Sequence, residues 1–133
     1  NNKYIPRAGE SGAQTELNYL TNYRSIRYAD VLLMAAEANV RAAAPNVAKA
    51  QNYLDLVRDR AFGDTEHRVT ATRQAIWAER NFELSMEGHR FFDLVRTKQA
   101  ASKINGFVDG KHDVFPIPQQ EVDISGLTQN SGY

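Results

Sequence analysis

Apolar residues in the first half of the chain recur with the period of a helix. From Tyr23 onward they stand three or four residues apart, which places them on one helical face. Members of this stripe are Ile26, Ala29, Leu33, Ala36 or Glu37, and Val40. The pattern predicts a helix of about five turns. It should end near Ala44, because Pro45 disfavours a helical conformation in the residue before it.

A second stripe follows after a short gap. Its members are Ala50, Leu54, Val57 and Ala61. Asn46 is placed to cap this helix by accepting a hydrogen bond from a free backbone N–H group, and Gly63 is placed to end it. Because so few residues join the two helices, they should fold back on each other as an antiparallel hairpin over residues 24–62.

The pattern predicts a second helix pair over residues 70–104. Thr70 or Thr72 should cap its first helix, which should run toward Gly88. Apolar members of this helix are Ile76, Trp77 and Leu84. Glycine is costly inside a helix, so Gly88 predicts a break, a kink or a close backbone contact. A further helix should cover about residues 90–102.

The two ends of the chain carry turn residues without a helical period. Residues 1–23 are expected to form an irregular leading segment, and residues 105–133 an extended tail that contains "FPIP". The predicted fold is therefore mainly α, built from antiparallel helix pairs of about the size of tetratricopeptide units and joined by irregular loops.

Composition excludes several classes of function. Sixteen basic and sixteen acidic residues cancel and are mixed along the chain, so no basic surface for nucleic acid is expected. The apolar run "VLLMAA" is too short to cross a bilayer, and the absence of cysteine rules out disulfides and thiolate ligands. The opening "NNKYIPRAGESG" resembles the middle of a polar loop, so the chain is expected to be a fragment of a longer protein.

The stretch "AERNFELSMEGHRFFDLVR", residues 78–96, carries the most charge among apolar residues. Glu79, Glu83 and Glu87 stand four apart, which on one helix would stack them in a single row. A glycosidase needs two carboxyl groups on opposite sides of a bond, usually from different elements. The Glu-x-x-His pattern of di-iron bundles also fails, because Met86 and Arg90 stand where histidines would be required.

Basic residues interleave with these carboxylates at helical spacing. Arg80 precedes Glu83 by three residues, Arg90 follows Glu87 by three, and Asp93 precedes Arg96 by three. Aromatic residues and leucines occupy much of the remaining surface, so some charges should be buried and paired. A structural charge network is therefore predicted, made of Arg27, Asp30, Glu37, Arg58, Glu79, Arg80, Glu83, Glu87, Arg90, Asp93 and Arg96.

Other candidate chemistry is sparse. The three histidines, His67, His89 and His112, lack a zinc spacing, and no nucleophile or nucleotide motif occurs, so no metal site and no cofactor are predicted. Tyrosines in and beside the leading segment could stack on a sugar ring or a base, or pack against their own fold. These weak candidates for ligand binding are Tyr4, Tyr19 and Tyr23.

The order of the motifs resembles the C-terminal region of the SusD/RagB family. The matching blocks are "RYADVLLMAAEA", "AQNYLDLVRDRAFG", "AIWAERNFELSMEGHRFFDLVR", "FPIPQQEV" and "LTQNSGY". They all fall within residues 24–133 and include the family's "ER…E…EG.R..DL.R", "PIP" and terminal "QN.GY" patterns. The chain departs from the pattern at Phe91, where tryptophan is common, at Thr97, where an aromatic residue is frequent, and at Ser131, where proline is usual.

This resemblance implies an outer-membrane, surface-exposed nutrient-binding lipoprotein of Bacteroidetes, anchored through a cysteine outside this chain. Such a protein captures oligosaccharides or other nutrients for a SusC-like TonB-dependent transporter and catalyses no reaction. The chain would be mainly scaffold, packed against the remainder of its own full-length protein, with the sugar-contacting residues elsewhere. Two alternatives remain open from the residues: a helical-repeat scaffold that only docks proteins, and a carbohydrate-active hydrolase.

Overall fold

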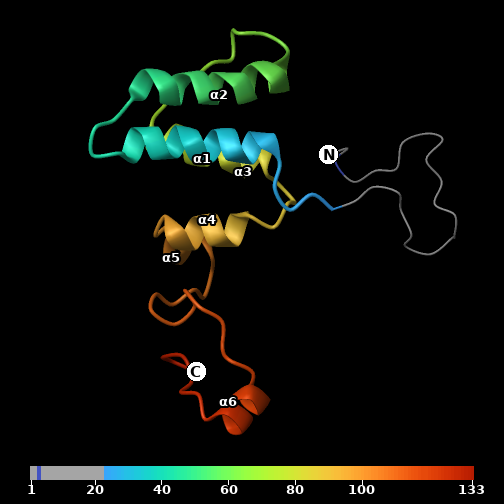
Figure 1. Ribbon diagram of the computed structural model, residues 1–133, viewed down its shortest axis with the longest axis vertical. Coiled ribbons are helices and arrows are strands. Elements are labelled where there is room, and N and C mark those ends of the chain that lie inside the picture. Colours follow the sequence, from blue (N-terminus) through green and yellow to red (C-terminus); the bar gives the residue numbers. More distant parts are fainter. Residues whose placement is uncertain (1–2, 4–22) are drawn as a thin grey trace, which may run out of the picture.

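The computed structural model describes residue 3 and residues 23–133. Within these residues it contains six α-helices and no strand (Figure 1). The mainly α fold predicted from the periodicity is thus confirmed. The helices are α1 (Tyr28–Arg41), α2 (Val47–Phe62), α3 (Arg73–Glu83), α4 (Arg90–Arg96), α5 (Ala100–Lys103) and α6 (Gln119–Ser125).

The core lies where α1 packs between α2 and α3. In Figure 1 α1 and α2 run side by side in opposite directions, with α3 against α1. Leu33, Leu54 and Ile76, one from each helix, are completely buried. Alanines in the same cluster, among them Ala36 and Ala50, allow close approach of the helix backbones. The apolar stripes read from the sequence therefore form this three-helix layer.

Helix α1 is shorter than its apolar pattern predicts. It begins at Tyr28, after Arg27 in an extended conformation, and it ends at Arg41 rather than near Ala44. Ile26, which continues the stripe in the sequence, lies before the helix and is 68% exposed. The physical reason is that the side chain of Arg27 bonds to the turn after α3, which fixes this segment outside the helix.

Helix α2 begins and ends at the residues that the sequence indicates. The Asn46 side chain accepts a hydrogen bond of 3.0 Å from the backbone N–H of Lys49. Gly63 adopts φ +79°, the left-handed conformation that glycine enters without steric cost, and closes the helix.

The sequence leaves two threonines as possible caps of α3, and the structure selects one. The Thr72 hydroxyl accepts a hydrogen bond of 3.1 Å from the N–H of Ala75. Among the described residues the Thr70 hydroxyl caps no helix donor, and its backbone carbonyl accepts from the N–H of Thr72. We expect Thr72→Ala to lower the free energy of unfolding by about 1 kcal/mol, because a helix donor loses its partner.

The matched control is Thr70→Ala, which should change that free energy by less than about 0.5 kcal/mol. Urea unfolding of both variants of the intact protein measures the difference. Equal losses in the two variants would contradict the assignment of the cap.

The predicted second helix pair differs from the observed arrangement in two ways. Helix α3 ends at Glu83, five residues before Gly88, and residues 84–88 form turns in which Met86 and Gly88 have positive φ angles. Helix α3 then packs against α1 instead of pairing closely with the helix that follows it. The carboxylates of Glu79, Glu83 and Glu87 consequently do not stack along one helix, because the last of them lies in the turn.

The predicted helix over residues 90–102 is divided into α4 and α5. Lys98 has φ +58°, a left-handed conformation that ends the first segment. The Thr97 hydroxyl donates to the carbonyl of Asp93 at 2.6 Å, and the Gln99 amide donates to that hydroxyl at 2.8 Å. These local bonds replace helical bonds at the break.

The tail over residues 105–133 is not wholly extended, because it contains the helix α6. Pro118, with φ −52° and ψ 133°, precedes this helix, and Gly126 in a left-handed conformation ends it. The "PIP" motif itself is irregular and extended, as expected.

Side chains of the terminal motif hold the "PIP" segment in place. Gln129 accepts from the N–H of Ile117 and donates to its carbonyl, both at 2.8 Å, as a neighbouring strand would do. The amide of Asn130 donates to the carbonyl of Phe115 at 2.7 Å. The "PIP" and "QN.GY" motifs, which are separate in the sequence, are therefore joined by hydrogen bonds in the structure.

Candidate functional site

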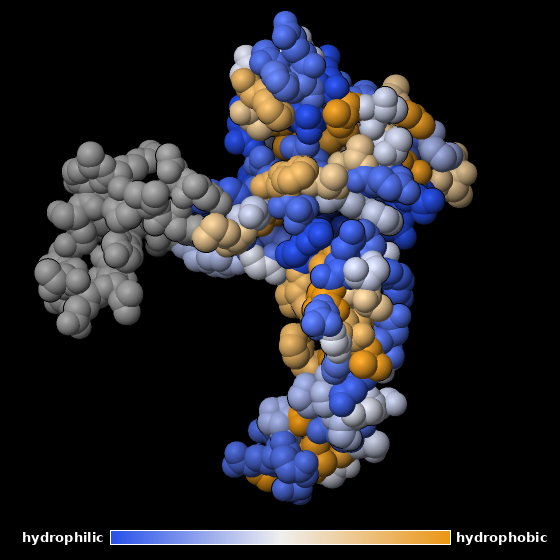
Figure 2. Space-filling model, turned by 180° about the vertical axis from the view of Figure 1, so that it is seen from behind, coloured by the Kyte–Doolittle hydropathy of each residue, from blue (hydrophilic) through white to orange (hydrophobic). Residues whose placement is uncertain are grey.

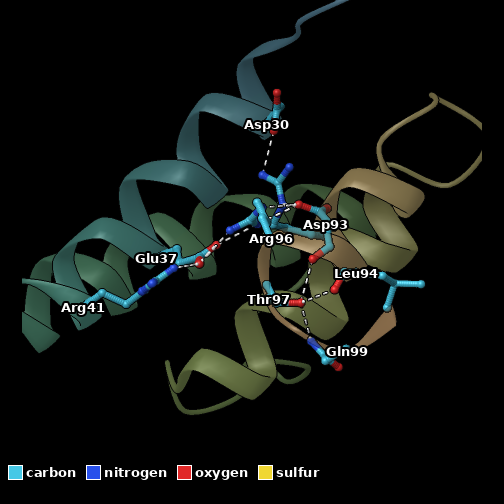
Figure 3. Close-up of polar contacts among 9 residues, drawn as sticks. Asp30, Glu37, Arg41, Asp93, Leu94, Arg96, Thr97 and Gln99 are labelled. Atoms are coloured by element: carbon cyan, nitrogen blue, oxygen red, sulfur yellow. Dashed lines mark hydrogen bonds and ion pairs between the residues drawn. The ribbon is translucent and has the colours of Figure 1, made fainter. Parts of the chain in front are cut away.

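The charge-rich stretch of residues 78–96 lies at the junction of the helical layer with α4. Arg80 of α3 is at its centre and is only 5% exposed. Its guanidinium donates to Asp30 of α1 at 2.7 Å and to Asp93 of α4 at 3.0 Å. One buried arginine therefore joins three helices, and its partners Asp30 and Asp93 are labelled in Figure 3.

A second connection between α1 and α4 runs through Glu37. Arg96 donates to both oxygens of this carboxylate, at 2.8 and 2.9 Å, in the bidentate geometry that a planar guanidinium favours. Arg41, one turn further along α1, donates to the same carboxylate at 2.9 Å. Arg96 also pairs with Asp93 at 2.7 Å, which links this connection to Arg80 (Figure 3).

The end of α3 and the turn after it are held from the start of α1. The Arg27 guanidinium bonds to the carboxylates of both Glu83 and Glu87, at 2.7 Å in the case of Glu87. Lys3 reaches the same turn, where its ammonium group bonds to Glu87 and to the carbonyl of Ser85 at 3.2 Å. A cation at the carbonyl end of a helix is also favoured by the helix dipole.

Helix α2 contributes two arginines to α3. Arg58 pairs with Glu79, and Arg60 pairs with Glu83. Arg58 also donates to the carbonyl of His67 at 2.6 Å, which anchors the loop between the two helices.

All but one of the residues proposed for the network form ion pairs, but these pairs fall into separate groups around Arg80, around Arg27, and between Arg58 and Glu79. The exception is Arg90, which is exposed and has no ion-pair partner among the described residues. Of the three pairs suggested by the i,i+3 spacing, only Asp93 with Arg96 forms. Arg80 turns away from Glu83 toward other helices, because the aspartates there offer buried partners.

Three members of the site, Lys3, Arg41 and Arg60, are absent from the predicted network. Lys3 carries no signal in the sequence, because eighty residues separate it from Glu83, whose carbonyl it contacts. Arg41 could have been found, since it stands four residues after Glu37 on the same helix, the spacing of a helical ion pair.

The electrostatics of these carboxylates oppose a role in acid catalysis. Burial alone would raise the pKa of Glu37, but the guanidinium groups of Arg96 and Arg41 outweigh it and bring the pKa to about 2. The indole N–H of Trp77 also lowers the pKa of Glu37, although its geometry falls short of a hydrogen bond. Burial would also raise the pKa of Glu87, but the hydrogen bonds from Arg27 and Lys3 outweigh the effect of burial. The pKa of Glu87 is therefore lowered. A general acid at neutral pH needs the opposite shift.

The tyrosines proposed as ligand platforms are only partly described. Tyr4 and Tyr19 lie outside the described residues. Tyr23 is 63% exposed, and its hydroxyl donates to the carbonyl of Glu87 at 3.1 Å. Its hydroxyl thus anchors it to the turn, while much of its ring remains accessible.

Two further properties bear on the site. Among the described residues, no group of three histidine, aspartate or glutamate side chains is placed to hold a metal ion. No helix found in that part of the chain is long and apolar enough to span a bilayer.

Comparison with known proteins identifies the family. The model of the SusD family matches residues 1–114. The chain belongs to the SusD family. The sequence resemblance is therefore confirmed, although its last two blocks, which include "PIP" and "QN.GY", lie beyond the matched range.

Two SusD-like proteins of Formosa agariphila share the sequence. SusD-like protein P25 is 33% identical over 87% of this chain, and SusD-like protein P2 is 33% identical over 98% of it. The matched regions make up 26% and 29% of those proteins, so this SusD-family chain spans little more than a quarter of the length of its relatives.

Solved structures share the fold as well as the sequence. A laminarin binding SusD-like protein superposes with a TM-score of 0.81 and 41% identity, over 99% of this chain and 28% of that protein. Surface glycan-binding protein A from Bacteroides thetaiotaomicron gives a TM-score of 0.75 and 36% identity, over 87% of this chain and 26% of that one. The latter protein is also known in complex with laminarihexaose.

Proposed function

We propose that this chain is the C-terminal helical region of a cell-surface glycan-binding protein that passes oligosaccharides to a TonB-dependent outer-membrane transporter. The observation that carries the proposal is the similarity to a laminarin binding SusD-like protein over nearly the whole chain, at 41% identity. A neutral β-glucan of the laminarin type is accordingly the first ligand to test. The protein would be held at the outer membrane by a lipid anchor, as the family resemblance implies.

The described residues serve this function chiefly as scaffold. Every carboxylate of the 78–96 stretch is engaged by at least one arginine from another element or from its own helix. Such carboxylates cannot reach a sugar hydroxyl without giving up buried ion pairs. Sugar contacts would then come mainly from other segments of the protein, which the network holds in position.

Isothermal titration of the intact protein with laminarihexaose tests the proposal. We expect saturable binding with release or uptake of heat, and no binding of a charged glycan such as alginate oligosaccharide. Absence of binding to laminarihexaose and to every other neutral oligosaccharide in a panel would contradict glycan capture.

The two alternatives predict other outcomes. A scaffold that only docks proteins would bind no glycan but would still associate with the transporter. A hydrolase would release reducing ends from laminarin, and we expect none to be released. The low pKa of Glu87 supports this expectation, because a glycosidase acid must hold a proton at neutral pH.

A further inference from the structure

Aromatic side chains from three segments meet below the helical layer, where they line a cleft that the charge network leaves untouched. Phe91 comes from α4, Phe107 from the loop after α5, and Phe115 from the segment before α6. The ring centroids of Phe91 and Phe115 lie 5.6 Å apart, and those of Phe91 and Phe107 lie 6.4 Å apart. Figure 2 shows apolar surface in this narrow part of the molecule, between the helical layer and the end of the tail.

The cleft is large enough for a small ligand, and the residues that the structure describes leave one side of it uncovered. Its volume is about 280 Å³, just below the range of sites for drug-sized molecules, about 300 to 1,000 Å³. Phe115 is 65% exposed, so one ring presents much of its surface outward instead of packing against the other rings. Tyr133, at the rim, is 44% exposed.

Polar groups at the rim are free to bond a ligand. The Nδ1 atom of His112 accepts from the backbone N–H of Val108 at 2.9 Å, which places the proton of the neutral imidazole on Nε2 as an available donor. The Asn105 side chain makes no hydrogen bond with the described residues and can both donate and accept. The Tyr133 hydroxyl donates to the carbonyl of Val114 at 3.1 Å and keeps its acceptor lone pairs.

From this combination we propose that the cleft is a carbohydrate subsite for a neutral hexose unit, an inference that rests on the proposed function and locates part of it. A pyranose ring has an apolar C–H face suited to an aromatic ring and a rim of hydroxyls suited to amide, imidazole and phenol groups. The cleft is lined by no arginine, lysine, aspartate or glutamate among the described residues. Lys111 lies at the rim, where its ammonium group is 5.0 Å from the centre of the Tyr133 ring and is already engaged by that ring. A neutral glucan therefore fits the cleft better than a uronate or a sulfated glycan, whose anionic groups would find no charged side chain among the residues that line it.

The test uses Phe115 as a reporter in the intact protein. In Phe115→Trp the new indole keeps the aromatic platform, so its fluorescence, corrected for the wild-type emission, should change saturably as laminarihexaose is added. In Phe115→Ala the platform is lost, and the affinity of this subsite should fall roughly tenfold. Phe82→Ala is the matched control, because Phe82 is 71% exposed on α3 and does not line the cleft.

The outcomes separate the subsite from the proposed function. In one outcome the wild type binds laminarihexaose, the Phe115→Trp emission does not respond, and Phe115→Ala binds as tightly as the wild type. The cleft would then not be a sugar site, whereas the proposed glycan capture would stand. If the wild type binds no glycan, both inferences fail. A response of Phe115→Trp that is equal for laminarihexaose and for an alginate oligosaccharide would overturn the preference for a neutral hexose.

Discussion

Replacement of Arg80 by methionine is expected to lower the free energy of unfolding by about 3 to 5 kcal/mol, the largest loss among the single substitutions considered. Methionine fills a similar length of the side chain but carries no charge. Asp30, itself 4% exposed, would then remain as a buried carboxylate without its partner, and Asp93 would lose its link to α3. Three helices would lose their common connection.

Arg90→Met provides the matched control for this prediction. Arg90 belongs to the same stretch and carries the same charge, but it is exposed and forms no ion pair with the described residues. Its replacement should change the free energy of unfolding by less than about 0.5 kcal/mol. Urea unfolding of both variants in the intact protein gives the comparison, and a loss for Arg80→Met no greater than that for Arg90→Met would show that the buried pairs do not stabilise the fold.

Acid should remove about 3 kcal/mol of stability through Glu37 alone. The folded-state pKa of this residue is about 2, below its ordinary value of 4.5, because the ion pairs with Arg96 and Arg41 outweigh the effect of burial. A lowered pKa contributes stability that is fully present above the unfolded-state value. That contribution is lost as the pH falls from about 4.5 through about 2, where the carboxylate takes up a proton in the folded protein as well.

Glu37→Gln isolates this contribution from that of the other carboxylates. At pH 7 the variant should be about 3 kcal/mol less stable than the wild type, and the gap should close as the pH approaches 2. The measurement is the urea midpoint of both proteins at a series of pH values. A difference in stability between the two proteins that stays constant from pH 7 to pH 2 would show that ionisation of Glu37 does not stabilise the fold.

The helices were predictable from the sequence because each rests on local signals. The apolar stripe that includes Leu33 and the stripe that includes Leu54 define two faces that can only be buried against each other. Asn46 and Gly63 mark the ends of α2 by their own hydrogen-bonding and conformational preferences. These features involve residues close together in the chain, so a single sequence is enough to find them.

Helix ends that depend on distant partners could not be predicted in this way. The segment before α1 is held outside the helix by bonds from Arg27 to residues that lie 56 and 60 positions away in the chain. The break between α4 and α5 depends on Lys98 adopting a left-handed conformation, which its side chain does not favour by itself. A prediction from the helical pattern alone therefore makes α1 too long and joins α4 and α5 into one helix.

The charge network was predictable in its membership but not in its connections. Interleaved charges among apolar residues indicate that some of them must be buried and paired. Which pairs form depends on how the helices pack, and Arg80 bonds to Asp30 and Asp93 instead of to its neighbour in the sequence. The contribution of Lys3 had no signal, because its partners are distant in the chain and no charge pattern around it in the sequence points to them.

The central claim is that the carboxylates of residues 78–96 stabilise a scaffold and do not bind or cleave glycan. Glu87→Gln in the intact protein tests it most directly, with the thermal midpoint and the affinity for laminarihexaose measured on the same sample. Because Gln retains an oxygen but loses the charge paired with Arg27 and Lys3, we expect a loss of about 2 kcal/mol in stability. The affinity of the folded protein should be unchanged. An unchanged midpoint together with lost binding, or lost release of reducing ends, would contradict the account.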